Sequence, residues 1–258
     1  MIPGYRIVVC SRKRTHNMPT ILELLPNATV LVHESEREDY LKFVPEEQLA
    51  THDKLGISRI RQYALDCFPD ETIVFIDDDF KGVRSLVGER PSGYADAESI
   101  KQIVENAVNT SKDLGIDLFY WNRIANPMQF NGGNPFYFCA GYAGGAFGVN
   151  RRLLSFDQNL SEREDVDITL LSLLKNRKVL IDNRLYFQFG NVNQGTGGLQ
   201  GLRSSEATTA NNAYMKRKWG KWITLEAYHR RHVKVNKNRV TGTKVNVVRK
   251  QSMVGGAL

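Results

Sequence analysis

Three consecutive carboxylates, Asp77, Asp78 and Asp79, follow a run of apolar residues in the stretch IVFIDDDF (73–80). Like charges this close repel one another, and each loses hydration where a buried strand ends. Because side chains alternate in direction along an extended chain, Asp77 and Asp79 can face one way while Asp78 faces another. Two carboxylates on one side suit a hard divalent cation such as Mg²⁺ or Mn²⁺. An acidic turn that caps the next helix is the structural alternative.

A second acidic cluster, EREDVD (162–167), opens the apolar helix pattern of residues 165–176. A carboxylate at such a position can act as a general base that takes a proton from a hydroxyl group. Asp165 is the first candidate, and Glu164 or Asp167 can share or replace that role. Acidic residues also favour the first turn of a helix because they complement its dipole, so a purely structural role stays open.

Alternating strand and helix patterns must position these two clusters. Short runs of β-branched residues predict strands at 6–10, 28–34, 72–76 and 116–121, with one or two more in 179–190. Helical periodicity predicts helices at 19–27, 55–68, 98–115 and 165–176. This order predicts an α/β fold with an open, mostly parallel sheet and helices on both faces. Such sheets bind ligands beyond the carboxyl ends of their strands, where Asp77 to Asp79 are expected to lie.

The composition is that of a folded globular protein, with 41% hydrophobic and 24% charged residues. No stretch approaches the roughly 18 apolar residues of a membrane span, and the first residues do not resemble a signal peptide. The three cysteines, Cys10, Cys67 and Cys139, lack the spacing of metal ligands. We therefore expect a cytoplasmic protein with reduced thiols and no membrane partner.

Charge divides the chain into two parts. Residues 1–202 contain 22 Lys and Arg against 26 Asp and Glu, whereas residues 203–258 contain 13 against two and carry a net charge of +11. In the second part, Lys and Arg alternate with aromatic residues that include Trp219 and Trp222. Cations for phosphates and aromatic faces for bases are typical of a nucleic-acid surface, although a solvated basic face has the same composition. We expect a catalytic body over 1–202 and a basic aromatic extension over 203–258.

Taken together, these features resemble the GT-A glycosyltransferases, which use nucleotide-sugar donors. Four segments that cover about residues 5–190 match this family in its order: LGISRIRQYAL (55–65), IVFIDDDF (73–80), AGGAFGVNRRLL (143–154) and EREDVDITLLSLL (162–174). The resemblance implies a GT-A fold and transfer of a sugar to a hydroxyl group.

The resemblance also implies which residues bind the donor. Arg61 and Ser58 would contact the nucleotide, and Asp77 and Asp79 would hold the metal. Asp78 would lie beside the donor with a mainly structural role. The implied cofactor is Mn²⁺ or Mg²⁺, and the implied donor is a nucleotide-sugar, with a UDP-sugar preferred.

The two remaining segments would form the sugar and acceptor side of the site. Gly144 and Gly145 would let the backbone approach the sugar closely. The family keeps its catalytic base in the acidic pair that opens the helix, which implies Asp165, with Glu164 as the alternative. A third metal ligand is left unassigned.

The acceptor is implied by a narrower resemblance. A compact GT-A body with a basic aromatic extension is similar to the phage glycosyltransferases that accompany TET/JBP-type base oxygenases. These enzymes are thought to modify hydroxymethylated pyrimidines in DNA, which implies 5-hydroxymethylcytosine in DNA as the acceptor. It also implies the cytoplasm of a bacterium or a phage-infected host.

Three alternatives remain open at this point. A protein, glycan or lipid acceptor is the main rival to DNA. A nucleotidyltransferase also places carboxylates at strand ends, but the segment CSRKRTHN (10–17) lacks the glycine of its usual phosphate loop. A non-catalytic nucleic-acid-binding protein is disfavoured because both acidic clusters are intact.

Overall fold

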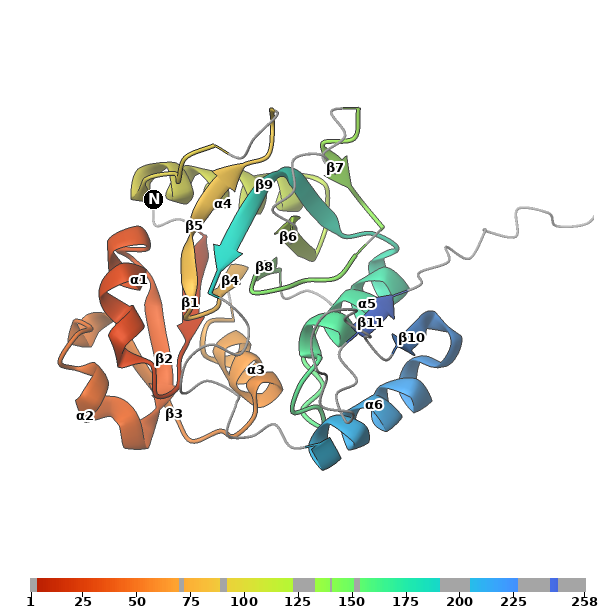
Figure 1. Cartoon of the computed structure of the whole chain (residues 1–258), viewed down its shortest axis with the longest axis horizontal. Coiled ribbons are helices and arrows are strands. Elements are labelled where there is room, and N and C mark those ends of the chain that lie inside the picture. Colours follow the sequence, from red (N-terminus) through yellow and green to blue (C-terminus); the bar gives the residue numbers. More distant parts are fainter. Residues whose placement is uncertain are drawn as a thin grey trace, which may run out of the picture.

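The computed structural model describes residues 4–69, 72–88, 92–122, 133–139, 141–150, 154–190, 205–226 and 242–245. These residues form an α/β fold in which one large mixed sheet carries helices on both faces (Figure 1). The predicted fold class is therefore confirmed. None of the described helices is long and apolar enough to cross a membrane.

The large sheet contains nine strands within the described residues. They are β1 (Tyr5–Cys10), β2 (Thr29–His33), β3 (Leu49–His52), β4 (Thr72–Ile76), β5 (Phe80–Ser85), β6 (Leu118–Asn122), β7 (Phe136–Tyr137), β8 (Ala146–Val149) and β9 (Leu180–Phe189). Their order across the sheet is β3-β2-β1-β4-β8-β6-β9-β5, and β7 also pairs with β9. Strands β3, β2, β1, β4, β6 and β9 share one direction, while β8, β5 and β7 run against it.

The described helices are α1 (Met18–Leu24), α2 (Arg37–Tyr40), α3 (Ile57–Cys67), α4 (Ala97–Asp113), α5 (Glu164–Asn176) and α6 (Ser205–Trp219). Four of them, α1, α3, α4 and α5, correspond to the four predicted helices. After α6, strands β10 (Ile223–Glu226) and β11 (Gly242–Val245) form a small antiparallel sheet.

Two hydrophobic layers hold the helices on the sheet. On one face, α1 and α4 pack on alternate strand residues such as Ile7 and Val9 of β1. On the other face, α3 and α5 pack on the intervening residues, including Val8. Every second residue of a strand points to the same face, so a fully apolar strand such as β1 can serve both layers at once.

Strand β8 lies within the glycine-rich segment 143–154, for which periodicity predicted no strand. It lies between β4 and β6 and is antiparallel to both. Gly148 of β8 pairs with Phe119, and a Cβ atom at Gly148 would lie 1.9 Å from the Phe119 ring. This glycine is therefore required by packing inside the sheet.

Strands β3, β5, β7, β10 and β11 were not predicted. Strand β3 is short, and β5 contains Gly82 and two charged residues, so neither shows the apolar run that marks a buried strand. Strand β5 nevertheless forms an edge of the sheet through antiparallel pairing with β9. The predicted boundary at residue 202 lies outside the described residues; beyond it, α6 runs beside α5 (Figure 1).

Candidate active site

The three carboxylates form the turn between β4 and β5. The Asp77 N–H donates to the Gly145 carbonyl at 2.8 Å, which extends the pairing of β4 with β8. The Phe80 N–H donates to the Asp77 carbonyl at 3.2 Å and closes the turn. The acidic run therefore sits at the carboxyl end of a central strand, as the sequence indicated.

Asp78 points into the protein. Its carboxylate accepts hydrogen bonds from Ser11 Oγ and Arg14 Nη1, both at 2.7 Å. Ser11 also contacts the Tyr40 hydroxyl at 2.7 Å. Because Asp78 is buried and satisfied by these donors, it anchors the turn to the segment after β1. These contacts give Asp78 a structural role in the turn.

Asp77 and Asp79 keep part of their side chains exposed, 44% and 28% respectively. Partial burial raises the pKa of Asp77 to about 7; Asp79 and Asp78 add to this rise, and Arg61 opposes it. Burial also raises the pKa of Asp79, with Asp78 adding to the effect and Arg14 opposing it. Arg61 and Arg14 thus offset only part of the repulsion between these neighbouring carboxylates.

Two glycines make room for these carboxylates. A Cβ atom at Gly145 would lie 2.9 Å from Asp77 Oδ2 and 2.9 Å from Cζ of Phe189. A Cβ atom at Gly190 would lie 3.4 Å from Asp79 Oδ2. Gly144, predicted together with Gly145, is half-buried next to it. The glycine-rich segment therefore approaches the acidic turn directly.

Arg61 of α3 joins the acidic turn to the start of α5. Its Nη2 contacts Asp77 Oδ1 at 2.7 Å, and its Nη1 contacts Glu164 Oε1 at 2.5 Å. The guanidinium also lies 4.9 Å from the centre of the Phe147 ring, within the range of a cation–π contact. One cation is thus shared by two carboxylates that lie far apart in sequence.

Arg61 and Ser58, the two α3 residues predicted to contact the nucleotide, lie below the protein surface. Arg61 is only 3% exposed and both of its terminal nitrogens are used by protein carboxylates, so it does not face a donor in this conformation. Ser58 is fully buried, one turn earlier on the same helix. Both residues support the site from beneath its surface.

The three acidic residues at the start of α5 have different surroundings. Glu164 is buried against Arg61, and burial raises its pKa to about 7 although Arg61 opposes the rise. Asp167 is buried too, and it is held by Lys218 and Trp219 of α6. Asp165 is the only one of the three that is not fully buried, and one of its oxygens accepts the Val166 N–H at 2.8 Å. Asp165 is therefore the most exposed of these three carboxylates.

A pocket of about 590 Å³ opens beyond the carboxyl ends of β1 and β2. Arg12, Lys13 and Lys42 contribute positive charge to it, Glu36 and Asp39 contribute negative charge, and Phe43 contributes an aromatic ring that is 46% exposed. Tyr40 lines the pocket and also accepts the Arg14 N–H at 3.1 Å, which links the pocket to the donors that hold Asp78. Cations beside a flat apolar ring suit a nucleotide.

Sequence reasoning missed this pocket. The signal was the basic run SRKR (11–14) directly after the first strand, at the edge where α/β sheets bind ligands. Among the described residues, no group of three or more His, Cys, Asp or Glu side chains is arranged to hold a metal.

Comparison with solved structures identifies the fold. The mannosyltransferase PcManGT from Pyrobaculum calidifontis, solved with GDP-mannose and Mn²⁺, superposes with a TM-score of 0.54 and 13% sequence identity over 83% of this chain. The fold is that of a GT-A glycosyltransferase. The aligned region spans 66% of PcManGT, so likeness to that protein extends over about two thirds of its length.

A second structure, TarS from S. aureus, aligns with 83% of this chain and 40% of its own, with 12% identity and a TM-score of 0.47. The sequence itself matches no family model and no curated protein.

Proposed function

We propose that this protein is a metal-dependent glycosyltransferase that moves a sugar from a nucleotide-sugar to a hydroxyl group. The observation that carries the proposal is that Arg61 joins the two acidic clusters, through the partly exposed Asp77 and the buried Glu164. Asp77 lies on one side of this arginine and the first turn of α5 on the other, and Asp165 is near enough to raise the pKa of Asp77. The GT-A fold supports the same proposal.

The acidic turn fits a divalent cation. Mg²⁺ and Mn²⁺ commonly bind through one or two carboxylates together with substrate phosphates and water. Asp77 and Asp79 offer two such carboxylates, and Gly145 leaves the space beside Asp77 free of a side chain. When bound, the cation would neutralise the negative charge of the diphosphate leaving group.

The donor nucleotide is proposed to occupy the pocket beside β1 and β2. Phe43 offers an exposed ring for the base, and Arg12 and Lys13 offer cations for ribose-linked phosphates. The sequence resemblance favoured a UDP-sugar, whereas the PcManGT structure contains GDP-mannose. UDP- and GDP-sugars are therefore the two donor classes to be compared.

The chemistry on the acceptor side is proposed to depend on Asp165. Its carboxylate accepts the proton of the acceptor hydroxyl while that oxygen forms a bond with the anomeric carbon. The bond from this carbon to the diphosphate oxygen breaks, and the diphosphate leaves with the bonding electrons. Arg61 does not touch the substrate in this scheme, but fixes Asp77 and Glu164 relative to each other.

For the acceptor we propose 5-hydroxymethylcytosine in DNA, on the basis of the +11 charge of residues 203–258. Lys216 and Arg217 of α6 are exposed and available to phosphates. Lys218 and Trp219 lie in the same basic aromatic segment, but they bind Asp167 and are not counted among the proposed phosphate contacts. A glycan, protein or lipid acceptor remains the rival.

A single incubation series tests donor and acceptor together. DNA that contains 5-hydroxymethylcytosine is mixed with the protein, Mn²⁺ and a panel of UDP- and GDP-sugars, then digested to nucleosides for mass spectrometry. The expected product is a glycosylated nucleoside that is absent with unmodified DNA and with the Asp79→Asn variant. Donor hydrolysis without modified nucleoside would point to another acceptor, and attachment of a nucleoside monophosphate would point to a nucleotidyltransferase.

A further inference from the structure

Helix α6 is packed into the body of the protein by one apolar face. Met215 and Trp219 are buried in a small hydrophobic cluster, together with residues of α5 and of the segment before it. The cluster consists of Leu160, Val166, Leu170, Met215, Trp219 and Ile223. A helix held in this way is part of the folded body.

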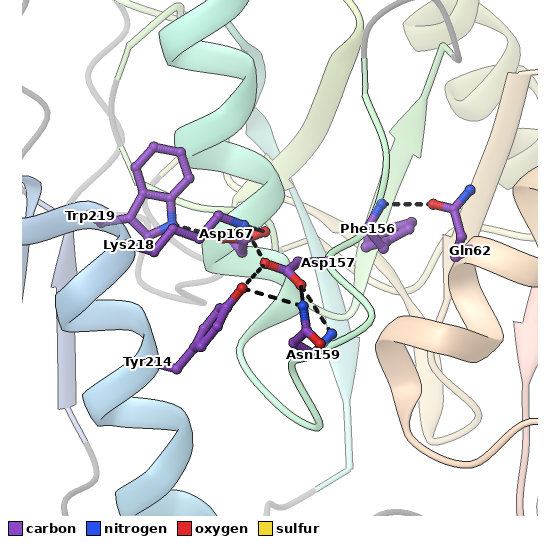
Figure 2. A network of polar contacts seen from close by, with 8 residues as sticks. All are labelled: Gln62, Phe156, Asp157, Asn159, Asp167, Tyr214, Lys218 and Trp219. Atoms are coloured by element: carbon purple, nitrogen blue, oxygen red, sulfur yellow. Dashed lines mark hydrogen bonds and ion pairs between the residues drawn. The ribbon is translucent and has the colours of Figure 1, made fainter.

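A polar network lies beside this cluster and joins α6 to the first turn of α5 (Figure 2). The indole N–H of Trp219 donates to Asp167 Oδ1 at 2.7 Å. Lys218 Nζ lies 2.8 Å from the same oxygen and 2.6 Å from Asp157 Oδ2. The Tyr214 hydroxyl also donates to Asp157, at 2.8 Å. Two adjacent α6 residues thus hold a carboxylate that is 1% exposed.

The start of α5 needs such support. The residue before the helix, Arg163, has a left-handed backbone with φ of 68°, and its side chain makes no capping hydrogen bond. A non-glycine residue in this region is strained, and a helix start without a side-chain cap is weakly defined by its own sequence. The geometry of the first turn must therefore be set by tertiary contacts.

Those contacts come from two sides. Glu164, at the start of the turn, is held by Arg61 of α3. Asp167, three residues later, is held by Lys218 and Trp219 of α6. Asp165 lies between the two fixed residues and contributes the partly exposed carboxylate.

We propose that Lys218 and Trp219 are positioning residues, which fix the first turn of α5 and with it Asp165 for proton transfer. This inference rests on the proposed function for its catalytic part. It assigns to α6 a role in turnover that is separate from acceptor binding. A displacement of about 1 Å at a reacting group is enough to reduce a rate about 100-fold, so a loosened turn should act mainly on kcat.

The test uses substitutions that remove the polar contacts and keep the packing. Trp219→Phe keeps an aromatic ring but loses the N–H donor, and Lys218→Met keeps the aliphatic stem but loses the charge. Lys218→Arg restores a cation, and Ala213→Gln alters an exposed position on the same helix as a control. Hydrogen exchange of the peptide 161–176, the affinity for UDP or GDP with Mn²⁺, and kcat and KM are measured for each variant.

In the Trp219→Phe/Lys218→Met double variant, exchange in 161–176 should rise about tenfold, because the turn opens locally more often. Its kcat should fall about 10- to 100-fold while donor affinity stays within about twofold. Lys218→Arg should recover most of the kcat that Lys218→Met loses, and Ala213→Gln should match the wild type. Unchanged exchange, or a loss of donor affinity equal to the loss of kcat, overturns the inference.

The two proposals fail in different ways. If the wild-type protein turns over no donor, but hydrogen exchange in 161–176 rises in the double variant, the proposed function is refuted. In that case α6 still stabilises the first turn of α5. An active wild type with unchanged exchange refutes only the positioning role.

Discussion

Arg61 and Glu164 lie 103 positions apart in sequence, yet their side chains form a buried ion pair between α3 and α5. The same guanidinium reaches Asp77 at the end of β4. One arginine therefore sets the distance between the proposed metal site and the helix that carries the proposed base. Burial makes this arrangement costly to disturb, since a carboxylate left without its cation cannot be hydrated.

Replacement of Arg61 by Met should destabilise the protein by about 3–5 kcal/mol, because Glu164 would be left buried and unpaired. The double variant Arg61→Met/Glu164→Gln should recover part of this loss, since the uncompensated charge is removed as well. Urea unfolding of Arg61→Met, Glu164→Gln and the double variant measures the coupling free energy between the two side chains. If the two single losses of stability simply add up in the double variant, the side chains do not pair directly.

Asp79→Asn should abolish sugar transfer without altering the fold, because the side chain is partly exposed and its ion pair with Arg14 is long, at 4.0 Å. Chelation by EDTA should have the same effect on turnover, and added Mn²⁺ should restore it. Asp113→Asn, at the exposed end of α4, removes the same charge and should leave turnover unchanged. Full activity in EDTA would remove the metal from the mechanism.

Asp165→Asn should lower kcat by about 10² to 10⁴, the usual contribution of a general base, with little change in donor affinity. Glu164→Gln should instead act mainly on stability, because Glu164 is buried against Arg61. Rates at saturating donor together with thermal melts separate the two effects. If Glu164→Gln is inactive while folded and Asp165→Asn retains turnover, the assignment of the base is reversed.

Gly145→Ala should be harmful because the new methyl group would lie 2.9 Å from both Asp77 Oδ2 and the Phe189 ring. Both neighbours are side-chain ends, so relief of these contacts must shift the Asp77 carboxylate and the Phe189 ring; we expect a loss of about 1–3 kcal/mol in stability and weaker Mn²⁺-dependent nucleotide binding. Gly93→Ala is the matched control, since no atom of the described residues lies within 4 Å of the place its methyl group would take. Equal nucleotide affinity in both variants would show that the turn tolerates the methyl group.

Binding to DNA should weaken steeply with salt if residues 203–258 contact the phosphates. Lys216→Ala and Arg217→Ala should each reduce the slope of log affinity against log salt by about one unit. Lys101→Ala on α4 removes the same charge from another surface and should leave the slope unchanged. Salt-independent binding would show that this segment does not contact DNA phosphates and would favour a glycan or protein acceptor.

The sequence by itself determined the class of fold and the place of the acidic turn. The strands around β1 and β4 and the helices α1, α3, α4 and α5 follow from local periodicity, which depends only on which residues are apolar. The carboxylates at residues 77–79 follow directly from the end of a buried run. Their position at the sheet edge needed no tertiary information beyond the order of strands and helices.

Only the tertiary structure decided how each buried charge is satisfied. Arg61 resembled a donor contact in sequence, but folding encloses it between Asp77 and Glu164. Lys218 and Trp219 resembled nucleic-acid contacts, but they hold Asp167 instead. Local sequence shows that a side chain is charged or aromatic. The partners Asp167 and Glu164 come from chain segments 51 and 103 residues away, because the packing of helices on the sheet, and not the neighbouring sequence, fixes which polar groups meet.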